Sequence, residues 1–161
     1  MISCYWIEAD RLAGRQGPNQ VPWDLSALAL RFDLVISLTE RMLNRSNEFA
    51  EVGLDHVCIP LPKNRPPLNG DKTEIKIILP LLFDLMKKEL SRGRRVLVHC
   101  SSGKDRTALV LAYYLMRERG ISPEDAAAKI VELKPNAFSA LGWHELALAT
   151  LSELAGSNDS N

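Results

Sequence analysis

The chain of 161 residues is long enough to bury the hydrophobic core of one domain. Its 20 basic and 20 acidic side chains cancel, and its apolar runs are too short to span a bilayer, which excludes nucleic acid and membrane insertion from our expectations. The N-terminus lacks the apolar core of a signal peptide, and three cysteines without a CxxC pair imply neither a disulfide framework nor a zinc cluster. We therefore expect a cytoplasmic protein with one domain over residues 1–155 and a flexible tail over 156–161.

Hydrophobic patterning predicts an alternation of short strands and longer helices. The β-rich runs lie at residues 4–7, 34–38, 56–59 and 95–99. The helical patterns cover residues 24–31, 40–49, 72–90, 107–119, 123–133 and 143–154. This order is typical of the α/β class. We predict a single-domain three-layer sandwich in which helices flank a mostly parallel sheet of about four or five strands.

Local signals support several helix boundaries. Asp71 with Glu74 predicts a capping box at the start of the third long helix. Ser122 before a proline predicts an N-cap, and Gly120 suits the end of the preceding helix.

Two segments are predicted to be loops. Residues 14–22 are polar, and residues 60–70 hold four prolines, which cannot continue a strand or a helix. We expect the proline-rich segment to be a mobile surface flap.

The run VLVHCSSGKDRTALVLAYYL passes from a strand through a polar loop into an apolar helix. Backbone N–H groups in such a loop bind tetrahedral oxyanions, and the helix dipole adds positive potential. Gly103 permits the left-handed turn that the loop needs. We therefore predict a site for phosphate, sulfate or vanadate, formed by Ser101, Ser102, Gly103, Lys104, Asp105 and Arg106.

Four side chains at this loop have the chemistry of phosphoryl transfer. The positive field favours the thiolate of Cys100, which makes it the candidate nucleophile. Arg106, at the spacing C-x5-R, can bind two phosphoryl oxygens with its planar fork. His99 can hydrogen-bond the loop backbone, and Thr107 can donate its hydroxyl to the sulfur when the sulfur leaves.

The run HCSSGKDRT resembles the HCxxGxxR(S/T) signature of the protein tyrosine and dual-specificity phosphatase superfamily. WIEADRLAG, LVISLTE and GLDHVCIPLP resemble segments of its small bacterial and archaeal members. The resemblance implies a compact phosphatase fold and a two-step hydrolysis through a cysteinyl-phosphate. It also implies a phosphotyrosine or dual-specificity protein phosphatase that acts on phosphorylated proteins or small phosphoesters, as a monomer, without a metal or cofactor.

The sequence departs from the family at two points. Small members place their general-acid aspartate where this chain has Lys63, and two residues are candidates to replace it. Asp71 lies ahead of a helix, within reach of the loop, and Asp105 lies inside the loop, as in myotubularin-like phosphatases. Near residues 134–143, the glutamine that positions water in related enzymes is replaced by Ser139 or Asn136.

Other functions fit parts of the pattern. Lys104, with Arg65 and Lys63, can form a basic rim for a phosphoinositide or another polyphosphate. A displaced acid also fits a weakly active phospho-binding module. Rhodanese-like sulfurtransferases place a cysteine in a similar loop, but the flanking Gly103 and Arg106 favour a phosphatase.

The remaining candidate residues are assigned to packing or the surface. Cys4 and Cys58 lie among apolar neighbours on predicted strands, which favours buried structural thiols, with a redox role as the alternative. No chemistry is assigned to His56, His144 or Trp143, because neither histidine has a second metal ligand at helical spacing.

Overall fold

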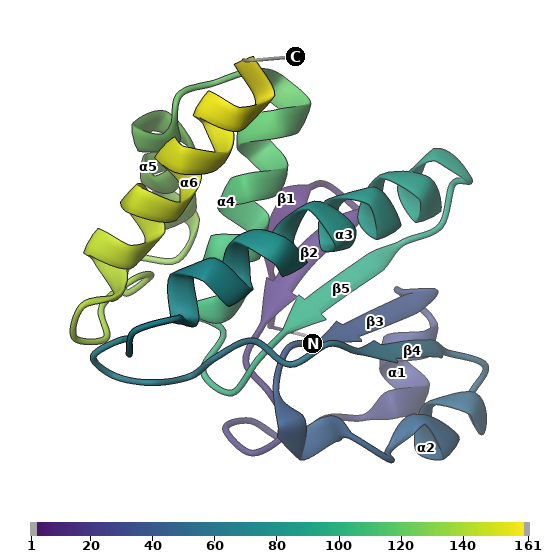
Figure 1. Cartoon of the computed structure of the whole chain (residues 1–161). Helices are drawn as coiled ribbons and strands as arrows, with labels where there is room; N and C mark the ends of the chain where they lie inside the picture. Colours follow the sequence, from purple (N-terminus) through teal and green to yellow (C-terminus); the bar gives the residue numbers. More distant parts are fainter. Residues whose placement is uncertain (1–2, 160–161) are drawn as a thin grey trace. The chain divides into compact units, whose positions relative to one another are not determined.

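A computed structural model describes residues 3–159 of the chain (Figure 1). Its internal contacts divide it into two compact units. We call Met1–Pro60 with Leu85–Gly103 the sheet unit, and Leu61–Asp84 with Lys104–Asn161 the helical unit. No helix within residues 3–159 is long and apolar enough to cross a membrane.

The sheet unit contains a five-stranded sheet in the order β1-β2-β5-β3-β4. The strands are β1 (Tyr5–Glu8), β2 (Leu12–Arg15), β3 (Leu34–Ser37), β4 (Asp55–Cys58) and β5 (Val96–His99). The β1–β2 pair is antiparallel, and the other three pairs are parallel. The predicted α/β class, the mostly parallel sheet and the four predicted strands are confirmed.

The sequence does not predict strand β2, because LAGR has no β-branched residue and its second half lies in the segment expected to be a polar loop. A turn with Asp10 at a φ of 59° returns the chain so that β2 pairs with β1 on one side. On its other side β2 pairs with the central strand β5, and all four of its residues are buried. Pairing on both edges therefore overrides the weak strand propensity of this segment.

Helices α1 (Leu25–Ala29) and α2 (Ser46–Ala50) lie on one face of the sheet (Figure 1). The predicted helix over residues 40–49 is divided into a 3-10 turn, η1 (Glu40–Met42), and α2, with Asn44 at a φ of 67° between them. A buried apolar cluster joins strands and helices and consists of Ala13, Leu28, Phe32, Val35, Met42, Phe49, Leu54 and Leu97. This cluster is the core that holds β2, β3 and β5 in place.

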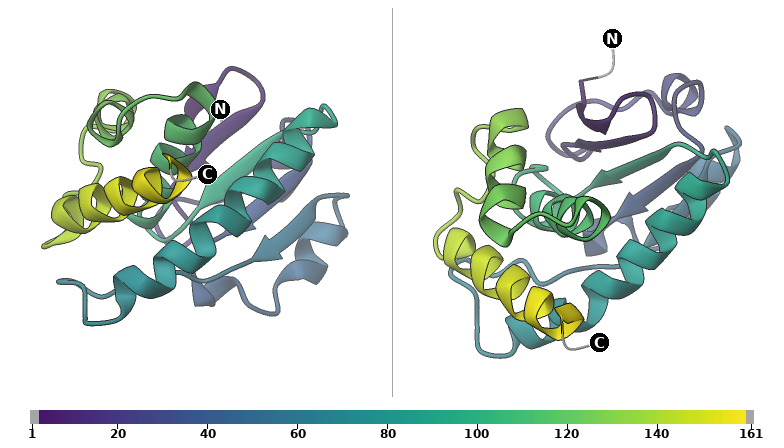
Figure 2. Two further views of the ribbon diagram at one scale, coloured as in Figure 1. Left: turned by 45° about the horizontal axis from the view of Figure 1, so that its top comes forward. Right: turned by 90° about the horizontal axis from the view of Figure 1, so that it is seen from above.

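The helical unit contains α4 (Arg106–Arg119), α5 (Pro123–Leu133), α6 (Trp143–Asp159) and the first part of α3 (Asp71–Ser91). Helix α5 packs against α4 and against α6 (Figures 1 and 2). The Ser122 hydroxyl accepts a hydrogen bond from the Asp125 amide, and Gly120 ends α4 with a φ of 62°, as predicted. Helix α6 continues to Asp159, five residues beyond the predicted helix end at 154. The flexible tail over 156–161 stays a prediction, and residues 160–161 lie outside the described residues.

Candidate active site

The cysteine loop lies between the end of the central strand and the start of a helix. Strand β5 ends at His99, and α4 begins at Arg106. Cys100 is 2% exposed and Arg106 is 7% exposed. The predicted order of strand, loop and helix is therefore present, and both candidate side chains are largely withdrawn from solvent.

Gly103 is held closely against the β1–β2 hairpin. Its φ of +72° is left-handed, and a Cβ there would lie 2.7 Å from the carbonyl oxygen of Arg15. The buried Tyr5 hydroxyl donates a hydrogen bond of 2.7 Å to the Gly103 carbonyl. The glycine is therefore required both for its backbone conformation and for the space it leaves.

The segment after β2 supports the first half of the loop. The Gly17 amide donates a 2.7 Å hydrogen bond to the Ser101 carbonyl, and a Cβ on Gly17 would collide with the carbonyl oxygen of Cys100. The Asn19 side chain donates a 2.7 Å hydrogen bond to the Ser101 hydroxyl. Residues 14–22, predicted only as a polar loop, thus brace the cysteine loop.

His99 is fully buried, and its Nδ1 lies 2.9 Å from the Cys100 carbonyl oxygen. Its Nε2 lies 2.5 Å from the Ser37 hydroxyl, which also lies 2.9 Å from Nε2 of His56. His56 therefore belongs to a polar network at the site, a role that was not predicted from the sequence. The pattern could not reveal this, because 19 residues separate Ser37 from its partner His56 and 62 separate it from His99.

The second half of the loop belongs to the helical unit, where residues 138–140 form hydrogen bonds with Lys104 and Asp105. The Phe138 amide donates a 2.8 Å hydrogen bond to the Lys104 carbonyl. The Lys104 ammonium lies 3.0 Å from the Asp105 carboxylate and 3.1 Å from the Ser139 hydroxyl. The Ala140 amide donates to the other Asp105 oxygen at 3.3 Å. Lys104 thus points into this cluster, where the sequence suggested a basic rim.

Asp71, the other candidate acid, does not form the predicted capping box. It is the first residue of α3, and the amide of Glu74 donates instead to the Gly70 carbonyl. One oxygen of its carboxylate accepts hydrogen bonds from the Leu68 amide at 2.8 Å and from the Asn64 side chain at 3.0 Å. The Asp71 side chain therefore holds the preceding loop, residues 61–70, against the start of α3.

The proline-rich loop is attached at several points and does not have the features of a free flap. The Trp143 indole donates a 2.9 Å hydrogen bond to the Asn64 carbonyl. A Cβ on Gly142 would lie 2.7 Å from Pro67, so the loop packs tightly against the start of α6. Lys63 and Arg65 on this loop are exposed.

Thr107 is fully buried, and its hydroxyl has no hydrogen-bond partner within residues 3–159. The three cysteines are free. Burial raises the pKa of the Cys4 thiol, against the opposing effect of Arg15, and burial also raises the pKa of the Cys58 thiol. Both shifts favour the less reactive thiol form. No group of three potential metal ligands occurs in the described part of the chain.

An open cavity of about 470 Å³ is lined in part by Asn19, whose side chain hydrogen-bonds Ser101 in the first half of the loop. It is lined by Pro18, Asn19, Thr39, Arg41, Met42 and Arg45. Its lining contains two guanidinium groups and no carboxylate, and Asn19 connects it to Ser101 through the hydrogen bond described above. Glu48 offsets the charge of one of these guanidinium groups through its ion pair with Arg45, so Arg41 is the cavity's other cationic group.

Comparison with known proteins connects these features to one family. The model of the dual specificity phosphatase catalytic domain matches residues 23–146. The tyrosine-protein phosphatase vhp-1 of Caenorhabditis elegans is 28% identical over 108 residues, which cover 62% of this chain and 16% of the relative. The phosphatidylglycerophosphatase and protein-tyrosine phosphatase 1 of Rattus norvegicus is 29% identical over 96 residues, which cover 60% of this chain and 47% of the relative. The chain thus matches less than half the length of these curated relatives.

A solved structure extends the likeness to nearly the whole chain. The crystal structure of Tk-PTP in its active form is 25% identical and superposes with a TM-score of 0.75. The match covers 94% of this chain and 97% of that one. The family model, which matches well over half of the chain, and this shared fold lead to the same assignment: the chain belongs to the dual specificity phosphatase catalytic-domain family, whose members are cysteine-dependent phosphomonoesterases.

Proposed function

We propose that this protein hydrolyses phosphomonoesters through a phosphoryl intermediate on Cys100. The observation that carries the proposal is the position of Cys100, buried at the end of the central strand in a loop that leads into α4. The thiolate attacks phosphorus, and the bond from phosphorus to the ester oxygen breaks. Water then attacks the same phosphorus, the bond to sulfur breaks, and inorganic phosphate leaves.

The other loop residues follow from that role. The backbone amides of residues 101–106 and the guanidinium of Arg106 bind the phosphoryl oxygens and stabilise their charge in the transition state. Thr107 stabilises the sulfur as it leaves, and its buried hydroxyl without a partner supports this assignment. The mechanism needs no metal and no cofactor.

Asp71 and Asp105 both remain candidates for the general acid that protonates the leaving oxygen. Each is 8% exposed, and each already accepts two hydrogen bonds within the helical unit. Replacing the true acid by asparagine should slow hydrolysis of an alkyl phosphate by about 10²–10⁴-fold. An aryl phosphate, whose leaving group needs little protonation, should lose much less. If both variants, Asp71→Asn and Asp105→Asn, treat the two esters alike, neither residue is the acid.

We infer a phosphotyrosine or dual-specificity protein phosphatase, which acts as a cytoplasmic monomer. The names of the curated relatives, which include a tyrosine-protein phosphatase, support this substrate class. The name of the rat relative, a phosphatidylglycerophosphatase, favours a phosphoinositide or other polyphosphate as the second candidate substrate. The engagement of Lys104 by Asp105 and Ser139 weakens the proposed basic rim, which ranks this candidate second. A weakly active phospho-binding module is the remaining alternative.

The test is phosphate release from phosphotyrosine, phosphoserine and phosphothreonine peptides, phosphoinositides and an aryl phosphate. Wild-type protein is compared with Cys100→Ser, which keeps the loop but removes the nucleophile. Release that depends on Cys100 supports the enzyme and ranks its substrates. Binding of phosphopeptide by both proteins without release would leave a phospho-binding module as the function.

A further inference from the structure

A chain of four hydrogen bonds runs through the sheet unit to the cysteine. The Ser46 hydroxyl lies 2.8 Å from Nδ1 of His56, whose Nε2 lies 2.9 Å from the Ser37 hydroxyl. That hydroxyl lies 2.5 Å from Nε2 of His99, whose Nδ1 lies 2.9 Å from the Cys100 carbonyl oxygen. We call Ser46, His56, Ser37 and His99 the relay. It connects an exposed serine with the residue proposed as the nucleophile.

The register of the parallel strands β3, β4 and β5 brings the relay side chains that lie on these strands next to one another. Ser37 is opposite His99 on β5 and opposite Cys58 on β4, and His56 lies two residues before Cys58 on the same face. Phe49 stacks on the His56 ring at 4.2 Å, and the Trp23 ring meets that of His99 edge-on at 4.5 Å. Both rings are therefore held in place, and Ser37 and His99 are fully buried.

The chemistry of the groups fixes the direction of these hydrogen bonds when His99 is neutral. A carbonyl oxygen only accepts, so Nδ1 of His99 carries a proton and Nε2 is an acceptor. The Ser37 hydroxyl must then donate to His99, and it accepts from a proton on Nε2 of His56. Nδ1 of His56 is left as an acceptor for Ser46.

The same geometry has a second solution, in which every bond except the one to Cys100 is reversed. His56 takes up a proton at Nδ1 and gives its Nε2 proton to Ser37. Ser37 passes its own proton to Nε2 of His99. One proton has entered from solvent, His99 has become an imidazolium, and every group of the relay still has a partner.

We propose that the relay works in both directions, and that its reversal lets His99 take up a proton and favours the thiolate of Cys100. A charged imidazolium places positive charge one residue from the sulfur and strengthens the hydrogen bond to the Cys100 carbonyl. In this scheme Ser37 and His56 are positioning residues. The consequence for the sulfur rests on the proposed function, in which Cys100 is the nucleophile.

Several charged groups face the relay and set the pH at which it reverses. Burial lowers the pKa of His56, and Arg45 at the start of α2 lowers it further. Glu48 offsets part of that charge through its ion pair with Arg45. Arg15 on β2 lies opposite His99 on β5, and its positive charge disfavours a second positive charge on the His99 ring. Because the reversed relay carries its positive charge on the fully buried His99, in register with Arg15, we expect acidification to be needed for reversal.

Two substitutions of His56 distinguish its hydrogen-bonding role in the relay from the packing of its ring against Phe49. Phenylalanine preserves a ring against Phe49 but leaves the reversed Ser37 hydroxyl without an acceptor, so it locks His99 in the neutral state. Glutamine can present either its N–H or its oxygen to Ser37, so it supports both directions. His144→Gln, which changes an exposed histidine of the helical unit, is the matched control.

The experiment measures the rate at which iodoacetamide alkylates Cys100 as a function of pH, with the modified cysteine identified by mass spectrometry. We expect His56→Phe to move the midpoint of the profile up by at least about half a pH unit, which is about a threefold slower reaction below the midpoint. His56→Gln and His144→Gln should follow the wild type. Identical profiles for His56→Phe and wild type overturn the relay.

This readout does not depend on substrate turnover. If Cys100 is alkylated no faster than Cys4 or Cys58 at any pH, the proposed nucleophile fails rather than the relay. Nitrogen NMR of the unmodified protein keeps the test independent of mutant folding. On acidification, His99 should gain a proton at Nε2 while His56 changes from the Nε2–H to the Nδ1–H form. A His99 that stays neutral throughout the stable pH range contradicts the proposal.

Discussion

Gly103 and Arg15 lie so close that a single methyl group on the glycine would stand 2.7 Å from the Arg15 carbonyl oxygen. Gly103→Ala should therefore impair both folding and anion binding. The left-handed φ alone costs about 1–2 kcal/mol, and the clash adds about 1–3 kcal/mol, as in an overpacked core. Denaturant unfolding and vanadate affinity are the measurements.

Gly120→Ala is the matched control for this substitution. Its φ of +62° is also left-handed, but an added Cβ has no neighbour within 4 Å. It should lose only the conformational contribution and keep full vanadate affinity. Equal losses of stability in the two alanine variants would mean that the contact with Arg15 is unimportant.

Tyr5→Phe removes the hydroxyl that binds the buried Gly103 carbonyl. We expect a loss of about 1–3 kcal/mol in the free energy of unfolding, because a buried acceptor is left without its partner. The anion affinity should fall as well, since the loop loses an anchor. Tyr113→Phe removes a buried hydroxyl that accepts from Arg117 in the helical unit, and it should spare anion binding. An unchanged anion affinity in Tyr5→Phe would show that the anchor does not shape the loop.

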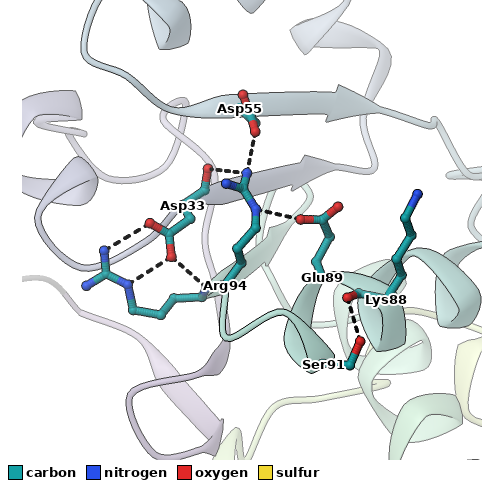
Figure 3. A network of polar contacts seen from close by, with 7 residues as sticks. Asp33, Asp55, Lys88, Glu89, Ser91 and Arg94 are labelled. Atoms are coloured by element: carbon teal, nitrogen blue, oxygen red, sulfur yellow. Dashed lines mark hydrogen bonds and ion pairs between the residues drawn. The ribbon is translucent and has the colours of Figure 1, made fainter.

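The ion-pair network in Figure 3 predicts a pH dependence of stability in the sheet unit. The side chain of Asp33 accepts two hydrogen bonds from the Arg95 guanidinium and one from the Arg95 amide. Arg94 contacts the Asp33 carbonyl, Asp55 and Glu89 (Figure 3). The hydrogen bond from Arg95 lowers the pKa of Asp33.

A lowered pKa in the folded state stabilises the protein above the unfolded pKa of about 4, and the contribution is lost as the pH falls through the folded value. At pH 7, Asp33→Asn should therefore cost about 1 kcal/mol. The difference from wild type should shrink as the pH falls below about 4. Denaturant titrations of both proteins at pH 7 and below about pH 4 measure this difference in the free energy of unfolding. A difference that stays constant with pH contradicts the role assigned to the Asp33 carboxylate.

Trp143→Phe should loosen the proline-rich loop without removing its packing ring. The indole hydrogen bond to the Asn64 carbonyl is lost, and we expect faster hydrogen exchange at the Leu68 amide and faster proteolysis within residues 61–70. Trp23→Phe breaks an equivalent indole bond, to the Gln16 carbonyl, in the sheet unit. It should leave the proline-rich loop unaffected. Equal protection of Leu68 in all three proteins would show that other contacts hold the loop.

Local sequence determined much of this protein. The apolar run before Cys100 predicts β5, and the run after Arg106 predicts α4, because periodicity and capping act over a few residues. Gly103 was identified for its left-handed backbone, and Ser122 and Gly120 for their helix ends. The family assignment follows from the same short stretch, because the residues of an anion-binding loop are consecutive in the chain.

The tertiary structure decided what supports the loop. Tyr5 meets Gly103 across 98 positions of sequence, and Asn19 meets Ser101 across 82. Strand β2 forms because two neighbouring strands pair with it, and the relay through His56 exists because parallel register aligns Ser37 with β4 and β5. Such contacts depend on which strands become neighbours. The order of the strands in the sheet is set by packing of the whole chain, so no local sequence pattern predicts these contacts.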